Sequence, residues 1–184
     1  YGICKAAVNL MAGVPSVVYG FFGLVCIVPL MQDLTGHDGS TMLTASILLG
    51  IMILPTIVSV CEAAICSVPT PYYEGALALG ATKERSIFLT VIPAAKSGIV
   101  AGIVLGIGRA IGETMAVVMV AGNQARMPKG ITRGVRTLTS NIVLEMGYAA
   151  DLHRQVLFTI GLVLFVFIMI INMTLNKILK GEKE

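Results

Sequence analysis

Two charged residues, Arg109 and Glu113, stand inside a long apolar run of the sequence. The run extends from Ser97 to Gly122 and contains no other charged residue. It is long enough to cross a bilayer, which requires about 20 apolar residues. A charge near the bilayer centre costs roughly 2.5–3.5 kcal/mol on insertion scales. A continuous helix would place the two residues on one face, so we expect them to line a pathway for a small charged solute. A structural ion pair that joins helices is the alternative.

The composition is that of a polytopic membrane protein. Of the 184 residues, 56% are hydrophobic and 12% are charged, whereas a soluble domain has about 25% charged residues. The formal net charge of +3 is too small to suggest nucleic-acid binding. The four cysteines form no CxxC pair, so the sequence indicates no metal site. A water-soluble globular enzyme is therefore excluded as an interpretation.

Four apolar segments are predicted to span the membrane, and they suggest one all-α transmembrane domain over residues 1–184. The connection 122–155 carries apolar residues at helical spacing from Ile131 to Met146. This spacing predicts an amphipathic helix on the membrane surface. The predicted spans are 14–31, 42–65, 97–121 and 156–175.

The connection 67–96 contains a short motif with a surface of small side chains. It reads EGALALG over 74–80 and continues with KER over 83–85. The first part predicts a short helix that Gly80 terminates, and a helix with small side chains can dock closely into a groove of a partner. The residues that we expect to contact this partner are Glu74, Gly75, Ala76, Gly80, Lys83 and Arg85.

This motif resembles the cytoplasmic coupling loop of ABC importer permeases. Their pattern is E-A-A, three residues, G, nine residues, and then I-x-L-P. Glu74, Ala76, Gly80 and Pro93 match it, and the differences are at Gly75, Thr90 and Ile92. The resemblance implies a bundle of transmembrane helices of the ABC importer permease type, with a coupling helix that seats on an ATPase subunit. It also implies that 67–96 is cytoplasmic and that 122–155 faces outward.

A second motif narrows the resemblance. The run GRAIGETMAV over 108–117 resembles phosphate ABC importer permeases, and the PstC-type subunit more than the PstA-type subunit. The stretches 13–24, 135–149 and 156–172 resemble the same subunit. Members of that family have a further N-terminal spanning portion, so we expect this chain to be the C-terminal part of a longer protein. The resemblance implies transport of inorganic phosphate across the prokaryotic cytoplasmic (inner) membrane.

The resemblance also implies the partners of this chain in the lipid bilayer. These are a second permease subunit of the PstA type, a dimer of ATP-binding subunits of the PstB type, and an extracytoplasmic phosphate-binding protein of the PstS type. The sequence has no G-x-x-x-x-G-K-[ST] loop for ATP. We therefore expect no catalytic residues and no cofactor in this chain, with ATP hydrolysis carried out by the partner.

The chemistry of the charged pair suits a phosphate pathway. A guanidinium binds two oxygens of a phosphate with a planar fork of donors. Arg109 lies about 12 residues into its predicted span, roughly 18 Å deep at 1.5 Å per residue, which is near the bilayer midplane. Glu113 could hold Arg109 in the absence of substrate, or accept a hydrogen bond from a protonated phosphate.

Three alternatives and one surface question stay open at the level of sequence. The alternatives are an ABC permease for another oxyanion, such as sulfate or molybdate, a non-transporting phosphate-signalling subunit, and a secondary transporter. In the outward connection, a basic cluster could meet an acidic rim on a solute-binding protein or could be a solvated face. This cluster consists of Arg126, Lys129, Arg133 and Arg136.

Overall fold

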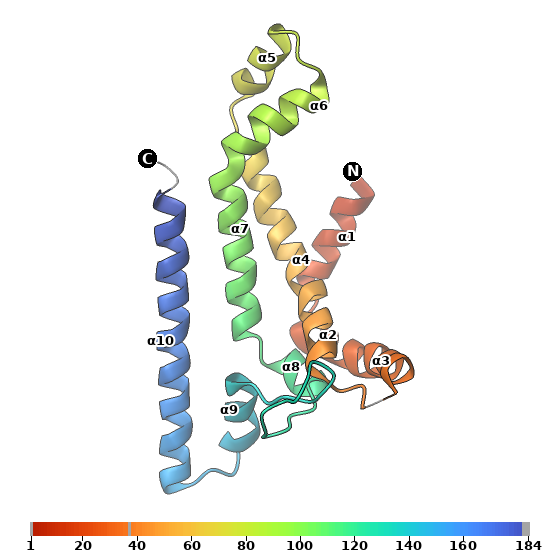
Figure 1. Cartoon of the computed structure of the whole chain (residues 1–184), viewed down its shortest axis with the longest axis vertical. Helices are drawn as coiled ribbons and strands as arrows, with labels where there is room; N and C mark the ends of the chain where they lie inside the picture. The colour runs from red at the N-terminus through yellow and green to blue at the C-terminus, as the bar shows by residue number, and fades with distance from the viewer. Residues whose placement is uncertain (1, 37, 182–184) are drawn as a thin grey trace.

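The computed structural model describes residues 2–36 and 38–181, and its regular elements are helices (Figure 1). Within these residues, the one β-type contact is an isolated bridge between Gly122 and Val135. The all-α fold class is therefore confirmed. In chain order the elements are α1 (Gly2–Gly13), α2 (Ser16–Phe22), the π-helical turn η1 (Gly23–Ile27), α3 (Val28–Thr35), α4 (Met42–Cys66), α5 (Thr70–Ala78), α6 (Lys83–Ser86), the π-helical turn η2 (Ile87–Val91), α7 (Ile92–Gly112), α8 (Met115–Val120), α9 (Leu138–Met146) and α10 (Asp151–Gly181).

Among the described residues, four stretches of helix are long and apolar enough to cross a membrane. The first joins α2, η1 and α3, and the third joins α6, η2 and α7. By length and composition, these stretches agree with the predicted multi-pass membrane protein. The four stretches are Ser16–Thr35, Met42–Cys66, Lys83–Gly112 and Asp151–Thr174.

The prediction of one continuous helix over 97–121 is wrong. Helix α7 ends at Gly112, and Glu113 has an extended backbone with φ −68° and ψ 129°. The chain then turns into the short helix α8. Oε1 of Glu113 accepts a hydrogen bond from the backbone N–H of Ala116 at 3.2 Å, so the side chain caps the new helix. Both halves of the run are apolar, so hydropathy alone does not reveal the break between them.

Helices α4 and α7 pack closely because one face of α7 lacks side chains. This face carries glycine at every fourth position, at Gly98, Gly102 and Gly106. A Cβ atom on Gly98 would lie 2.5 Å from the Cβ of Ala64, and one on Gly106 would lie 2.5 Å from Cγ1 of Ile57. These glycines therefore let the two backbones approach, as small residues do between helices in membranes.

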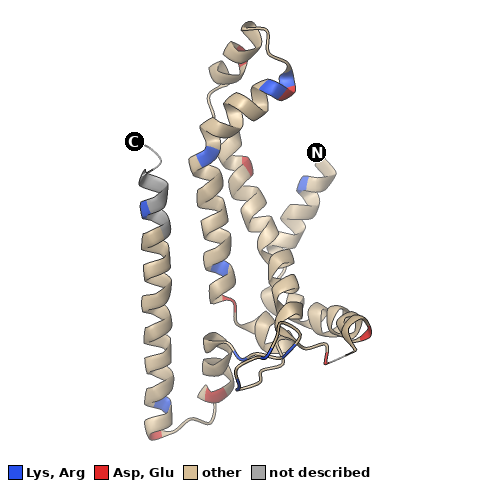
Figure 2. Ribbon diagram, viewed as in Figure 1, with Lys and Arg blue, Asp and Glu red and all other residues tan. Residues whose placement is uncertain are grey.

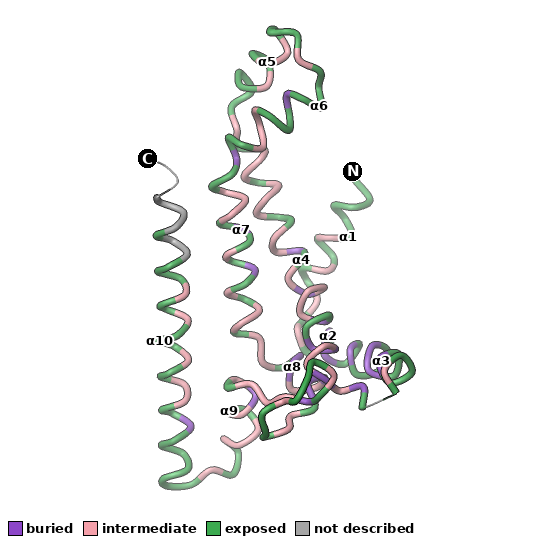
Figure 3. The backbone as a smooth tube through the Cα atoms, in the orientation of Figure 1, coloured by how far each residue is buried: buried purple, intermediate pink, exposed green. Residues whose placement is uncertain are grey.

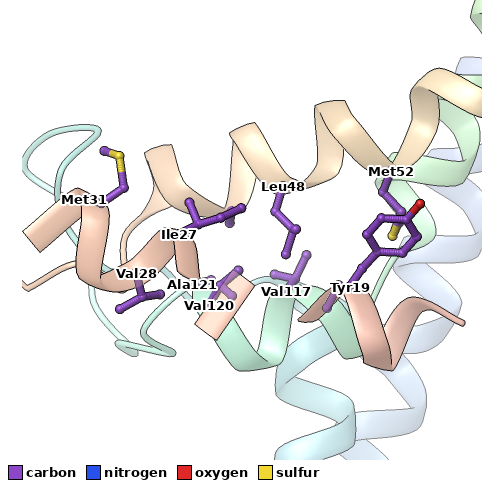
Figure 4. Close-up of a cluster of buried hydrophobic side chains, with 11 residues drawn as sticks. Tyr19, Ile27, Val28, Met31, Leu48, Met52, Val117, Val120 and Ala121 are labelled. Carbon is purple, nitrogen blue, oxygen red and sulfur yellow. The ribbon is translucent and has the colours of Figure 1, made fainter. Parts of the chain in front are cut away.

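The buried core lies where α2, α3 and α8 pack around the N-terminal half of α4 (Figure 4). Within this core, α8 supplies two completely buried side chains, since Ala116 and Val120 have no exposed surface. This burial explains why the chain turns inward after Gly112. The labelled members of the core are Tyr19, Ile27, Val28, Met31, Leu48, Met52, Val117, Val120 and Ala121.

Helix α10 leaves most of its apolar surface uncovered within this chain (Figure 3). Leu157 is the one buried residue among those of α10 whose side chains are described. Large side chains such as Phe158 and Phe165 are more than half exposed, at 62% and 64%. An exposed apolar surface of this extent belongs against lipid or another subunit.

Candidate functional site

Arg109 lies in the last turn of α7 and points its guanidinium toward α4. Nη1 donates a hydrogen bond to Oγ1 of Thr56 at 2.9 Å. Thr56 lies near the middle of α4, which runs from Met42 to Cys66. Arg109 is exposed within this chain. A guanidinium has five N–H donors, and the structure shows a protein acceptor for one of them among the described residues.

Glu113 does not share a helix face with Arg109, so the predicted geometry of this pair is wrong. The helix break at Gly112 separates the two residues. Among the residues that the structure describes, no ion pair joins their side chains. The half-buried Glu113 caps α8, and its backbone carbonyl accepts a hydrogen bond from the hydroxyl of Thr139 at 3.4 Å. A staple between Arg109 and Glu113 on one helix is therefore excluded.

A cavity of about 270 Å³ adjoins the elbow between α7 and α8. The Glu113 side chain is its one acidic lining group, and residues with hydroxyl groups on other elements line the same cavity. Ser46 belongs to α4, while Thr137 and Thr139 belong to the start of α9. These hydroxyls and Thr56 were missed at the level of sequence. Thr56 could have been singled out from the sequence, because it is a polar residue within the apolar run of α4.

The residues of the coupling motif lie together at one end of the molecule, far from α8 and α9 (Figure 1). Helix α5 begins at Thr70, earlier than the predicted start at Glu74. The predicted termination at Gly80 is confirmed, because Gly80 has φ +86° and its N–H donates to the carbonyl of Leu77. Glu74, Gly75, Gly80, Lys83 and Arg85 are exposed, and Ala76 is half-buried.

The charged residues concentrate in the loops and near the ends of the long helices (Figure 2). In the connection 122–155, the predicted amphipathic helix from Ile131 is wrong in its first part, since α9 begins at Leu138. The residues before α9 form a loop instead of a helix, and a backbone hydrogen bond closes the base of this loop. The N–H of Val135 donates to the carbonyl of Ala121 at 2.9 Å.

The predicted basic cluster is divided by the structure. Arg136 forms an ion pair with Glu145 of α9, with 2.7 Å between Nη1 and Oε1, while the other three cations line a separate pocket. A hydrogen bond from the Tyr148 hydroxyl, together with Arg136 and His153, holds the pKa of Glu145 below its ordinary value. The same hydrogen bond raises the pKa of Tyr148. This network joins the loop to α9 and to the start of α10.

This chain is similar in sequence to proteins named as ABC transporter permeases and as phosphate transport permeases. The "Probable ABC transporter permease protein YqgH" of Bacillus subtilis is 39% identical over 177 residues, which are 92% of this chain and 57% of that protein. The "Phosphate transport system permease protein PstC" of Xylella fastidiosa is 35% identical over 180 residues, which are 87% of this chain and 56% of that protein. The chain therefore spans somewhat more than half the length of these relatives, and they confirm the resemblance to phosphate permease subunits.

Solved structures and a family model agree with these relatives. A crystal form of the MetNI methionine ABC transporter in an inward-facing conformation superposes with a TM-score of 0.75 and 21% identity, over 98% of this chain and 74% of that chain. At this identity, the similarity concerns the fold alone. The model for binding-protein-dependent transport system inner membrane components matches residues 2–181. The chain belongs to this family of inner membrane transport components.

Proposed function

We propose that this chain is part of a transmembrane subunit of an ATP-driven importer that moves inorganic phosphate across the prokaryotic cytoplasmic membrane. The observation that carries the proposal is Arg109, a guanidinium that reaches the middle of the span α4 and has donors for which the described residues supply no acceptor. Phosphate oxygens suit such a group. The PstC relatives, whose printed names give phosphate transport, support the same substrate.

Coupling to ATP would pass through α5 and the turn that follows it. The partner at this surface is an ATP-binding subunit of the PstB type, present as a dimer. Glu74, Gly75 and Gly80 are exposed at the tip of the molecule, where a partner can reach them. Lys83 and Arg85 in α6 add a charged rim beside the same surface. Closure of the ATPase dimer would move this tip, and the tightly packed α4 and α7 would transmit the movement to the pathway.

The remaining partners follow from the surfaces that this chain leaves open. A second permease subunit of the PstA type would cover apolar side chains of α2, where Phe21 and Phe22 are 59% and 49% exposed. A phosphate-binding protein of the PstS type would deliver substrate at the end of the molecule that carries α8 and α9. Within this assembly phosphate would pass Arg109, while Glu113 positions the elbow beside it.

Reconstituted transport tests the proposal. The complete subunit, assembled with its partners in proteoliposomes, should take up radiolabelled phosphate only in the presence of ATP. Unlabelled phosphate should compete, whereas sulfate and molybdate in tenfold excess should not. Competition by sulfate or molybdate equal to that of phosphate would assign the chain to another oxyanion permease. Uptake without ATP would indicate a secondary transporter, and binding without uptake would indicate a signalling subunit.

A further inference from the structure

The loop between α8 and α9 holds a pocket whose walls are largely cationic. It has a volume of about 280 Å³ and is lined by Arg126, Met127, Pro128, Lys129 and Arg133. The three cationic residues are exposed. None of the lining residues is acidic, so like charges face one another around a hollow. This arrangement is unfavourable unless an anion or solvent separates the charges.

Hydrogen bonds hold the backbone of this loop in place. The carbonyls of Ile131 and Arg133 accept bonds from the first amides of α4, at 2.9 Å from Leu43 and 3.0 Å from Met42. These amides have no partner within their own helix, so the loop takes the place of an intrahelical acceptor. The base of the loop is closed between Ala121 and Val135, as described above. The backbone of Arg133, from which its side chain extends, is therefore fixed relative to the core.

The charges of the pocket are not neutralised by the described part of the chain. Nε of Arg126 donates to Oε1 of Gln124 at 3.1 Å, and this acceptor is neutral. Within residues 2–36 and 38–181, no ion pair joins Arg126, Lys129 or Arg133 to a carboxylate. Arg136, which follows closely in the sequence, differs in pairing with Glu145. The pocket therefore offers uncompensated positive charge where the neighbouring arginine does not.

We propose that this pocket binds a tetrahedral oxyanion of the phosphate class. Guanidinium forks of Arg126 and Arg133 can each hold two oxygens, and Lys129 supplies a compact charge. The oxyanion is either free inorganic phosphate or the phosphate group of an anionic lipid headgroup. Met127 and Pro128 limit the size of the hollow, which suits a small oxyanion with its water better than the broad surface of a protein.

The proposed site is distinct from Arg109 and does not depend on the proposed transport of phosphate. The loop lies at the end of the molecule opposite α5 and α6 (Figure 1). If α5 meets a cytoplasmic ATPase as proposed, the pocket opens on the outer side of the membrane. Only this sidedness rests on the proposed function, whereas binding rests on the pocket itself.

Chemical protection of Lys129 tests the site directly. The assembled complex is placed in nanodiscs of zwitterionic phosphatidylcholine and treated with an amine-acetylating reagent. Acetylation of Lys129 is followed by mass spectrometry with inorganic phosphate or chloride at equal ionic strength. By mass action, we expect phosphate at about twice its dissociation constant or more to slow acetylation of Lys129 about threefold or more relative to chloride. Lys177, an exposed lysine of α10, should react equally in both salts.

Two variants and a second lipid complete the test. Arg133→Gln should abolish the protection, while Arg154→Gln, which removes an exposed cation at the start of α10, should leave it unchanged. Nanodiscs with phosphatidylglycerol should show protection without added phosphate if a lipid headgroup is the occupant. Equal acetylation of Lys129 in both salts and in both lipids would overturn the proposal. Protection that survives in Arg133→Gln would also overturn it.

Discussion

Replacing Gly106 by alanine should destabilise the packing of α4 against α7. The new Cβ would lie 2.5 Å from Cγ1 and 2.7 Å from Cδ1 of Ile57. Carbon atoms in favourable contact are about 3.5–4.0 Å apart, so the helices must separate by roughly 1 Å or Ile57 must leave its rotamer. Overpacking of this kind costs about 1–3 kcal/mol, which corresponds to about 5- to 140-fold in the unfolding equilibrium at 1.4 kcal/mol per factor of ten.

The assay is thermal unfolding of the assembled complex in nanodiscs, followed by circular dichroism of its helices and by loss of the ATP-binding partner. Gly50→Ala in α4 is the matched control, because no neighbouring side chain lies within 4 Å of the position that the new Cβ would take and alanine favours a helix. Gly106→Ala should lower the unfolding midpoint, and the control should leave it unchanged or raise it.

A double variant tests the stated cause of this effect. Ile57→Ala removes both atoms that the new Cβ would meet, so Gly106→Ala should cost much less in that background than in the natural sequence. This non-additivity is expected for residues in direct contact. A clash with Ile57 is excluded as the cause if Gly106→Ala and Gly50→Ala unfold at the same midpoint, or if Gly106→Ala costs the same stability with and without Ile57.

Three further predictions concern the turn at Gly80, the contact between Arg109 and Thr56, and the network around Glu145. Gly80→Val should lose the ATP-binding partner on co-purification, because φ +86° costs a branched residue about 1–2 kcal/mol, whereas Gly80→Asn should retain it. Thr56→Val removes the acceptor of Arg109 and should raise the KM for phosphate uptake with assembly intact; an unchanged KM would exclude a positioning role for Thr56. The lowered pKa of Glu145 means that its contacts stabilise α9 at neutral pH, and this stabilisation is lost as the pH falls through the folded-state pKa. The hydrogen-exchange protection factors of α9, each taken relative to the intrinsic rate at the same pH, should therefore fall in acid for the natural protein and not for Glu145→Gln.

The main features of the fold were predictable from the sequence because they depend on hydropathy and short motifs. Long apolar runs specify membrane helices whatever their neighbours are. Gly80 ends α5 as predicted, since its left-handed conformation is a local property that glycine favours.

The break between α7 and α8 was not predictable in this way. It depends on where α8 finds a buried position against α2 and α4, and hydropathy is the same on both sides of Gly112. The error moved Glu113 from a shared face with Arg109 to a cap of α8. The partners of Arg109 and Arg136 were missed for a similar reason, because Thr56 and Glu145 reach them through tertiary contacts.

Transport by Arg109→Gln is the first test of whether Arg109 belongs to the path of phosphate. Radiolabelled phosphate uptake would be compared between this variant and the natural protein in proteoliposomes, with Arg154→Gln as a matched loss of charge. Co-purification of the ATP-binding subunit would establish that each complex assembles. Uptake should collapse in Arg109→Gln, while assembly of the complex and uptake by Arg154→Gln should remain normal. Unchanged uptake by Arg109→Gln would exclude Arg109 from the path of phosphate and leave it with a structural role.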